Sequence, residues 1–294
     1  MYLIESQGVF SRYSCENINE TKQDPIQIIP DALVLKVFSY LTLATLGTIC
    51  CVSQPWKQLA NTPILWKIAI YKEIAFGNDK WAECFGRHVV EDEDSREELS
   101  SLPLKAFIQD CKKFKKIFPL KKAKDCLMLV RLPKTLNGGL TLKSVGELAK
   151  KYFPASNTGY KHIMPDIIRQ EGDKSIDKSQ WVLMTQDVFP QITGKNYPLQ
   201  QKMVAYATEK FLIGYKIPPI LAATVCIFSR YFESNIRSNI PLFSGGSEIS
   251  IRCQEKVNCG YGMVVWGFEP DGIRLLCNSD SGFHRMGVAL LREF

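Results

Sequence analysis

Apolar side chains along residues 29–41, IPDALVLKVFSYL, outnumber those that one buried helix face needs. Three of them recur at i, i+4 and i+8, and the others widen this stripe on both sides: Leu33, Val34, Leu35, Val37, Phe38 and Leu41. A surface helix usually carries one apolar stripe over roughly a third to a half of its circumference. The extra apolar surface must therefore be covered by a small core inside this chain or by another protein.

Residues 27–75 read as a cluster of short helices. The first begins at Pro30, where the missing N–H costs nothing, and Asp31 favours its first turn through the helix dipole. LATLGTICCV follows as a second helix, and Ser53 can cap a third that begins QPWKQLA. Pro63 then opens ILWKIAIYKEIAF. Residues 1–26 are polar and irregular, and we expect a flexible arm there.

Residues 76–124 are expected to form a linker and a connecting basic helix. The stretch 86–101 is charged and poor in apolar side chains, which is typical of an exposed loop. In the helix that follows, apolar positions keep helical spacing, and lysines from Lys112 to Lys124 occupy the other face and the tail. This lysine cluster is either a solvated face or a contact for an acidic partner or phosphate.

From residue 125 to 294 the pattern predicts an α+β domain. CLMLVRL and QWVLMTQDV read as strands, and YPLQQKMVAYATEKF and PPILAATVCIFSRYFES as helices. The last 48 or so residues alternate apolar and polar positions between turns at EPDG and SDSG, which indicates three or four antiparallel strands. The predicted fold class is α+β, with a helical N-terminal cluster and a C-terminal domain of helices packed on an antiparallel sheet.

Composition sets limits on compartment and partners. The 294 residues are 46% hydrophobic, enough to bury a substantial core, and the net charge of +7 does not by itself argue for nucleic acid. We expect no signal peptide and no membrane span, because the most apolar late run, PPILAATVCIF, is too short to cross a bilayer. Ten scattered cysteines without a CxxC pair favour buried free thiols in a reducing, cytoplasmic compartment.

Two chemical sites are open alternatives. Cys259 or Cys277 with Asp280 and His284 could form a hydrolytic triad, in which a thiolate needs an oriented imidazole. The alternative for His284 is an ordinary turn residue. Cys253 and Cys259 could bind a metal, but no second pair supplies the remaining ligands that structural zinc requires. No phosphate-binding loop occurs, and we expect no catalytic residues, no metal and no cofactor.

One ungapped run of apolar positions resembles the F-box. It has a Pro at the start of the first helix, a VFSYL end to that helix, Val four residues before Trp, and then Leu-Trp; its members are Ile29, Pro30, Leu33, Val37, Phe38, Leu41, Leu46, Val52, Trp56, Leu59, Leu65 and Trp66. The resemblance covers residues 27–70. Ile29 stands where Leu is usual and Ala32 where an acidic residue is common, while Ser53 and Pro55 also depart. Ala32 and Pro55 could weaken docking.

The resemblance implies a three-helix unit that binds a Skp-type adaptor, which bridges to a cullin–RING ubiquitin ligase. It implies that the first helix lines the adaptor contact, with support from the second and third helices: Ile29, Pro30, Leu33, Val34, Val37 and Phe38 line it, and Leu46, Val52 and Trp56 support or share it. Leu41, Leu59, Leu65 and Trp66 fit the internal core better. The alternative is a helical subdomain with no special partner.

Residues 125–294 resemble an uncharacterised domain found in proteins of obligate intracellular bacteria. This resemblance implies no activity, but it raises the scenario of a bacterial effector in the host cytosol. The expected function is that of a non-catalytic F-box subunit that holds an unknown protein target for ubiquitination. The alternative is a Cys-dependent hydrolase in the C-terminal domain, placed at the ligase by the F-box.

Overall fold

The computed structural model describes residues 24, 26, 28–90, 95–237, 250–258, 260–269, 272–279 and 286–294. The chain divides into two compact units, Met1–Ala75 and Phe76–Phe294. The expected arm at residues 1–26 lies outside the described residues apart from Asp24 and Ile26. Each unit has its own architecture.

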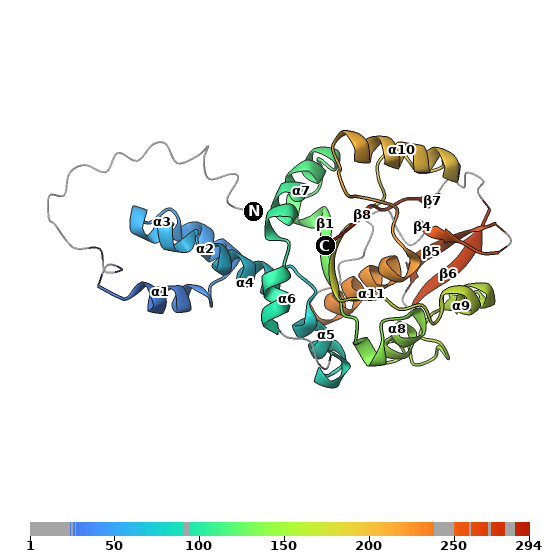
Figure 1. Cartoon of the computed structure of the whole chain (residues 1–294), viewed down its shortest axis with the longest axis horizontal. Helices are drawn as coiled ribbons and strands as arrows, with labels where there is room; N and C mark the ends of the chain where they lie inside the picture. The colour runs from blue at the N-terminus through green and yellow to red at the C-terminus, as the bar shows by residue number, and fades with distance from the viewer. Residues whose placement is uncertain are drawn as a thin grey trace. The chain divides into compact units, whose positions relative to one another are not determined.

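Four helices make up the described part of the smaller unit (Figure 1): α1 (Asp31–Phe38), α2 (Leu43–Ile49), α3 (Gln54–Ala60) and α4 (Pro63–Glu73). α1 packs on α3, and α2 packs on both α3 and α4. The buried apolar side chains come from all four helices and from the segment before α1: Ile26, Val34, Phe38, Leu46, Ile49, Ala60, Leu65, Trp66, Ala69 and Ile70. The unit therefore has a small core of its own.

Local signals in the sequence explain where these helices begin. Pro30 immediately precedes α1, and Asp31 lies in the first turn, as expected. Thr42 caps α2 by accepting a hydrogen bond from the Thr45 backbone N–H at 3.1 Å. A long-range contact adds to this, because the Leu43 N–H donates to Oε1 of Glu73 at 2.6 Å. The start of α2 is thereby held to the end of α4.

The larger unit holds the remaining helices and all strands of the described residues. Its α-helices are α5 (Asn78–Phe85), α6 (Ser95–Ser101), α7 (Leu104–Ile117), α8 (Leu142–Ala149), α9 (Pro165–Glu171), α10 (Tyr197–Lys210) and α11 (Ile220–Arg237). Short 3-10 turns occur at Arg87–Val90, Ala123–Asp125 and Leu136–Gly138. α10 lies within the helical pattern expected at 197–211, and α11 begins within the pattern expected at 218–234 and runs three residues beyond it.

Two sheets form in this unit. One has the order β1 (Leu127–Leu132), β3 (Gln180–Thr185) and β8 (Leu291–Glu293), all antiparallel. The other has the order β2 (His162–Ile163), β6 (Gly272–Asn278), β5 (Gly262–Glu269), β4 (Ser250–Lys256) and β7 (Met286–Gly287). Its three central strands are antiparallel, while the two-residue edge strands β2 and β7 pair in parallel. The α+β class is confirmed, with a mixed second sheet.

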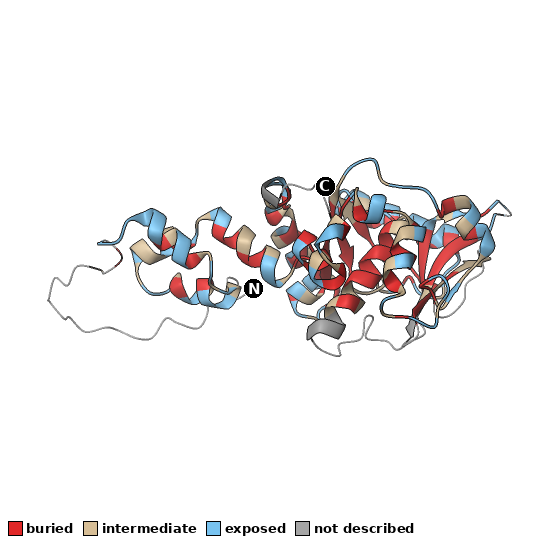
Figure 2. Cartoon of the chain, turned by 90° about the horizontal axis from the view of Figure 1, so that it is seen from below, coloured by how far each residue is buried: buried red, intermediate tan, exposed pale blue. Residues whose placement is uncertain are grey.

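Helix α11 joins the two sheets into one core. It contacts β1 of the first sheet and β4 and β5 of the second, and its middle is almost wholly apolar. Trp81, Phe228 and Phe232 are among the fully buried side chains. Figure 2 shows buried residues concentrated on the strands and on the helices that cover them. Continuous apolar strands such as LMLVRL are buried on both faces, as this arrangement requires.

The expected boundaries need correction in the larger unit. Residues 76–124 are not a linker, because Phe76 bridges to Val130 of β1 and Trp81 and Phe85 belong to the main core. The charged stretch 86–101 is not an exposed loop throughout either. Glu98 is 1% exposed, accepts a hydrogen bond from the Asn78 N–H at 2.8 Å, and receives the Trp181 indole N–H on its carbonyl. The compact unit therefore begins at Phe76, rather than at residue 125.

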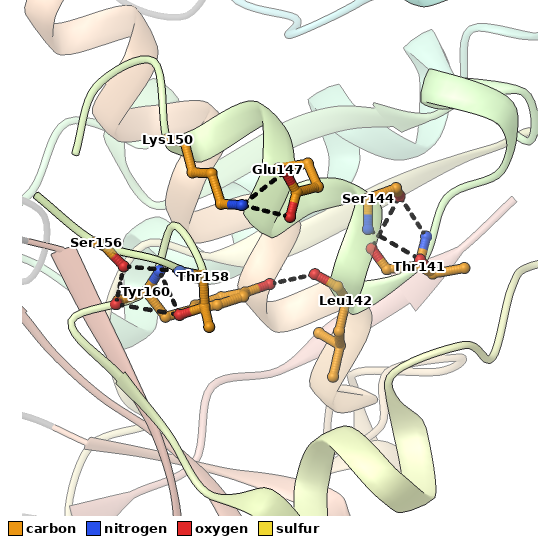
Figure 3. A network of polar contacts seen from close by, with 8 residues as sticks. All are labelled: Thr141, Leu142, Ser144, Glu147, Lys150, Ser156, Thr158 and Tyr160. Carbon is orange, nitrogen blue, oxygen red and sulfur yellow. Dashed lines mark hydrogen bonds and ion pairs between the residues drawn. The ribbon is translucent and has the colours of Figure 1, made fainter. Parts of the chain in front are cut away.

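A polar network fixes the start of α8 and the loop that follows it (Figure 3). Thr141 and Ser144 form a capping box, in which each side chain accepts a hydrogen bond from the other residue's backbone N–H, at 3.0 and 2.9 Å. The buried Tyr160 hydroxyl donates to the Leu142 carbonyl at 2.7 Å, and burial raises the pKa of this phenol. The loop is thus tied to the first turn of α8.

Two glycines let the same loop approach α8 at backbone distance. Gly159 has φ +76°, and a Cβ there would lie 1.8 Å from the Gly146 carbonyl oxygen. A Cβ on Gly146 would in turn lie 2.3 Å from the Thr158 carbonyl oxygen. Both positions therefore require glycine.

Candidate functional site

Helix α1 presents two adjacent apolar stripes with different surroundings. Val34 and Phe38 point into the smaller unit and are 5% and 4% exposed. Leu33 and Val37 lie one position N-terminal to them and are 55% and 61% exposed. Because residues four apart share a helix face, the two pairs form separate stripes. The apolar excess of the sequence is thus divided between an internal core and an exposed face.

The exposed stripe continues beyond both ends of α1. Ile28 and Ile29 precede it with 70% and 47% exposure, and Tyr40 follows it with 73%. Ile29, Leu33 and Val37 are spaced at i, i+4 and i+8, so they align along one face. The Lys72 ammonium donates to the Ser39 carbonyl at 3.2 Å and lies 5.5 Å from the centroid of the Tyr40 ring. This contact holds the C-terminal end of the stripe against α4. We call Ile28, Ile29, Leu33, Val37 and Tyr40 the α1 face.

The α1 face rests on a buried aromatic contact. The rings of Phe38 and Trp56 lie 5.7 Å apart between centroids, so α3 supports the inner side of α1. Trp56 is half-buried, and its indole N–H donates to Oδ1 of Asp24 at 2.8 Å. Ser53 donates to Oδ2 of the same carboxylate at 2.7 Å. These two hydrogen bonds hold the pKa of Asp24 below its usual range, and the bond from Ser53 has the larger effect.

Asp24 is a supporting residue that sequence reasoning missed. It also accepts a hydrogen bond from the Ile26 N–H at 3.1 Å, and Ile26 is buried in the core. The carboxylate therefore ties the segment just before α1 to the start of α3. An isolated aspartate in a polar segment carries no periodic signal, and its partners lie about thirty residues away along the chain.

The nine residues expected at the adaptor contact fall into three groups. Five are exposed in the described structure: Ile29, Pro30, Leu33, Val37 and Val52. Trp56 is half-buried. Val34, Phe38 and Leu46 instead lie inside the unit's own core, so they support the α1 face from below rather than line it. The residues expected in the internal core behave accordingly, since Leu65 and Trp66 are buried and Leu41 and Leu59 are half-buried.

The comparison with protein families bears on this unit. The family model described as F-box-like matches residues 26–69. The chain carries an F-box-like domain. The match begins at the buried Ile26 and ends at the buried Ala69, so it spans α1–α3 and most of α4. An F-box-like domain supports a general role as a ubiquitin ligase adaptor and a non-catalytic contribution to protein interaction. No solved structure matches the chain at a significant level.

Five cysteines of the larger unit are buried thiols whose surroundings disfavour the thiolate. Cys84, Cys111, Cys126, Cys226 and Cys253 are buried and free, as the sequence predicts. Burial raises the pKa of Cys84 to about 11 and raises the pKa of the other four as well. A catalytic cysteine acts as the thiolate, so these five stay protonated at neutral pH.

The hypothetical triad and metal pair mostly lie outside the described residues. Cys259, Asp280 and His284 lie outside the described residues. Cys277 is described and lies half-buried on β6. The described residues contain no group of three or more His, Cys, Asp and Glu side chains arranged to hold a metal ion. Among the same residues, no helix combines the length and apolar character needed to cross a membrane.

The lysine cluster divides between internal pairs and the outer surface. Lys113 pairs with Asp110, Lys121 pairs with Asp187, and Lys115 donates to the Pro119 and Lys121 carbonyls. Lys112, Lys116 and Lys122 are exposed. The cluster is therefore partly structural, and its outward lysines leave a basic helix face.

Proposed function

We propose that the α1 face of this chain binds a Skp-type adaptor and thereby recruits a cullin–RING ubiquitin ligase. The observation that carries the proposal is the row of large apolar side chains, Ile29, Leu33 and Val37, that α1 exposes beside its buried stripe. Isolated exposed apolar residues are common, but an aligned row of this kind is typical of a partner surface. An adaptor helix laid along this row would complete the burial that the chain itself leaves unfinished.

The larger unit holds the target in this proposal. It has its own extensive core, and its described cysteines are mostly buried and protonated, which favours binding over hydrolysis. Binding both partners raises the concentration of the target near the site of ubiquitin transfer, so the subunit needs no chemistry of its own. The cytoplasmic location and the role as an effector in a eukaryotic host stay predictions.

Co-purification tests assembly. The full chain is mixed with a purified Skp-type adaptor and a cullin, and the complex is isolated by size exclusion. We expect a ternary complex that the variant Leu33→Ala/Val37→Ala fails to form while it keeps its helical circular dichroism. The conservative variant Leu33→Met/Val37→Ile, which retains the apolar surface, should still assemble. Equal assembly by all three proteins would contradict the proposal.

A further inference from the structure

Helix α10 carries an exposed apolar stripe that the proposed function does not use. Its inner side chains, including Val204 and Ala207, are buried. On the outer side, Leu199 and Tyr206 are 42% and 62% exposed, and Met203 lies half-buried between them. These three residues are spaced at i, i+4 and i+7, so they align on one face. The Lys210 ammonium lies 5.9 Å from the Tyr206 ring centroid and extends the same line.

The stripe continues on the turn after α10. Phe211 and Ile213 are 43% and 71% exposed, whereas Leu212 between them is fully buried. The turn is held in place by Tyr215, whose carbonyl accepts from Thr208 Oγ1 at 3.0 Å and whose hydroxyl donates to Asp110 Oδ2 at 2.9 Å. The exposed side chains therefore stand on a fixed support.

Helix α7 packs against the turn that follows α10 (Figure 1). Tyr215 packs edge-on against Phe114 of α7, with ring centroids 5.0 Å apart. Asp110, which binds Tyr215, also pairs with Lys113 at 3.3 Å. Along the outer side of α7, Lys105, Lys112 and Lys116 are exposed at i, i+7 and i+11. These lysines share one helix face.

The two segments that contain α7 and α10 carry a large net positive charge. Residues 102–124 contain eight lysines and one aspartate, and that aspartate is buried. Residues 190–216 contain four lysines and one glutamate. Their net charges of +7 and +3 together exceed the +7 of the whole chain, so the rest of the protein is slightly acidic. The positive charge of this protein is thus concentrated in the two segments that contain α7 and α10.

We propose that the α10 surface binds a target segment that carries apolar side chains among aspartates and glutamates. We define this surface as Leu199, Met203, Tyr206, Phe211 and Ile213, bordered by Lys202 and Lys210 of the same helix. The apolar residues anchor the segment, and the lysines select and steer an acidic one. Three of the five anchors, Leu199, Met203 and Ile213, are not aromatic, whereas nucleic-acid bases bind by stacking on aromatic rings, so the surface favours a protein segment over a nucleic acid.

This inference rests on the proposed function only in naming the bound segment as part of the ubiquitination target. The 14 residues of α10 span about 21 Å at 1.5 Å per residue, which suits a short helical or extended segment. The α1 face belongs to a different unit of the chain and supplies none of these residues. Each surface can therefore be disabled separately.

Peptide selection on the full-length chain tests the inference. A random library of 16-residue peptides is displayed on phage, and the most enriched peptide is labelled for fluorescence anisotropy. We expect enriched peptides to combine Asp or Glu with Leu, Phe or Trp. The variant Tyr206→Ser/Ile213→Ser should weaken binding at least tenfold, while Tyr206→Phe/Ile213→Val should stay within threefold. Both variants change exposed side chains, and circular dichroism checks their fold.

Charge reversal tests whether the lysines of the α10 surface select an acidic segment. Lys202→Glu/Lys210→Glu should weaken binding of the same peptide at least tenfold at low salt and less at high salt. The matched control Lys143→Glu/Lys178→Glu places the same charge change on exposed lysines elsewhere in the larger unit, and it should leave affinity within about twofold.

Several results would overturn the inference. The selection could enrich peptides without acidic residues or enrich no peptide at all. The variant Tyr206→Ser/Ile213→Ser could also bind the peptide with unchanged affinity. A serine-sensitive interaction with vesicles of 30% phosphatidylserine, with DNA, or with a second copy of this chain, in the absence of peptide binding, would also overturn it. Loss of peptide binding with intact adaptor binding contradicts this inference alone. Loss of adaptor binding with intact peptide binding contradicts the proposed function alone.

Discussion

At the scale of single residues, Asp24 gives the F-box-like domain a pH-sensitive support. Hydrogen bonds from Ser53 and Trp56 lower the pKa of this carboxyl, so its ionised form is the one that the folded domain stabilises. The stabilisation is present above the ordinary carboxyl pKa of about 3.9 and disappears as the pH falls through the lower folded value. We expect the Trp56 indole N–H resonance to stay constant from pH 7 to about 4 and to shift only below.

The variant Asp24→Ala should show the shifted Trp56 resonance already at pH 7. A shift between pH 5 and 7 in the wild type, or an unchanged resonance in the variant, would contradict the role given to Asp24.

Asp110 makes a second prediction at this scale. Its carboxylate is 1% exposed and accepts from the Tyr215 hydroxyl and from Nη1 of Arg292 at 3.0 Å. Asp110→Ala would leave both donors unpaired, and we expect the free energy of unfolding to fall by about 3 kcal/mol. The control Lys113→Ala removes a half-exposed partner of the same carboxylate and should cost less than about 1 kcal/mol. Urea denaturation measures both, and similar losses would contradict this account.

The limits of sequence reasoning are clear at the residue scale on α1. Periodicity predicts that Leu33, Val34, Val37 and Phe38 are too many for one stripe, and the structure confirms this. Periodicity does not tell which stripe is inside, because that depends on where Trp56 of α3 packs. The split between core and exposed face therefore required the structure.

At the scale of elements, the close approach of Gly159 to α8 makes a sharp prediction. Gly159→Ala would put a Cβ in the left-handed region and 1.8 Å from the Gly146 carbonyl oxygen, so the loop must move. We expect a loss of about 2–4 kcal/mol from strain and overpacking together. Gly138 has nearly the same φ, +82°, with open space around it, so Gly138→Ala should cost only about 1 kcal/mol. Equal losses in thermal melts would show that the contact is unimportant.

Long helices and strands with periodic apolar positions can be predicted from the sequence, whereas very short strands cannot. Strands β1 and β3 and helices α7, α10 and α11 follow from apolar spacing over six or more residues. β2 and β7 have two residues each and exist through pairing with distant strands, so no local pattern marks them. The charged sequence of helix α6 predicts a loop, and this prediction is wrong. The buried Glu98 of α6 contacts Asn78 and Trp181, which are distant in sequence, so no local pattern indicates its burial.

At the scale of the whole molecule, the two units have separate cores. The main apolar cluster runs from Phe76 to Leu291 and includes no residue of the F-box-like domain. We therefore expect a fragment of residues 76–294 to fold alone, with a cooperative thermal transition close to that of the larger unit in the full chain. A fragment that lacks a cooperative transition or dispersed amide resonances would contradict this independence.

The charged segment at 86–101 explains why the boundary was misplaced in the sequence. A run of like-charged and polar residues is typical of linkers, but here α5 before it and α7 after it both pack in the larger unit. The expected linker includes Phe76–Phe85, whose apolar side chains belong to the main core of the larger unit. The bridge from Phe76 to Val130 and the burial of Trp81 and Phe85 in the main core assign this segment to the larger unit.

The dissociation constant between the full chain and a purified Skp-type adaptor tests the central claim most directly. Isothermal titration is run with the wild type, with Leu33→Ala/Val37→Ala and with Tyr206→Ser/Ile213→Ser. Truncating two anchors should cost about 2 kcal/mol or more, some thirtyfold in affinity. The account predicts that loss for the α1 variant and an unchanged affinity for the α10 variant. Wild-type binding that is absent, or that survives in the folded α1 variant, would contradict it.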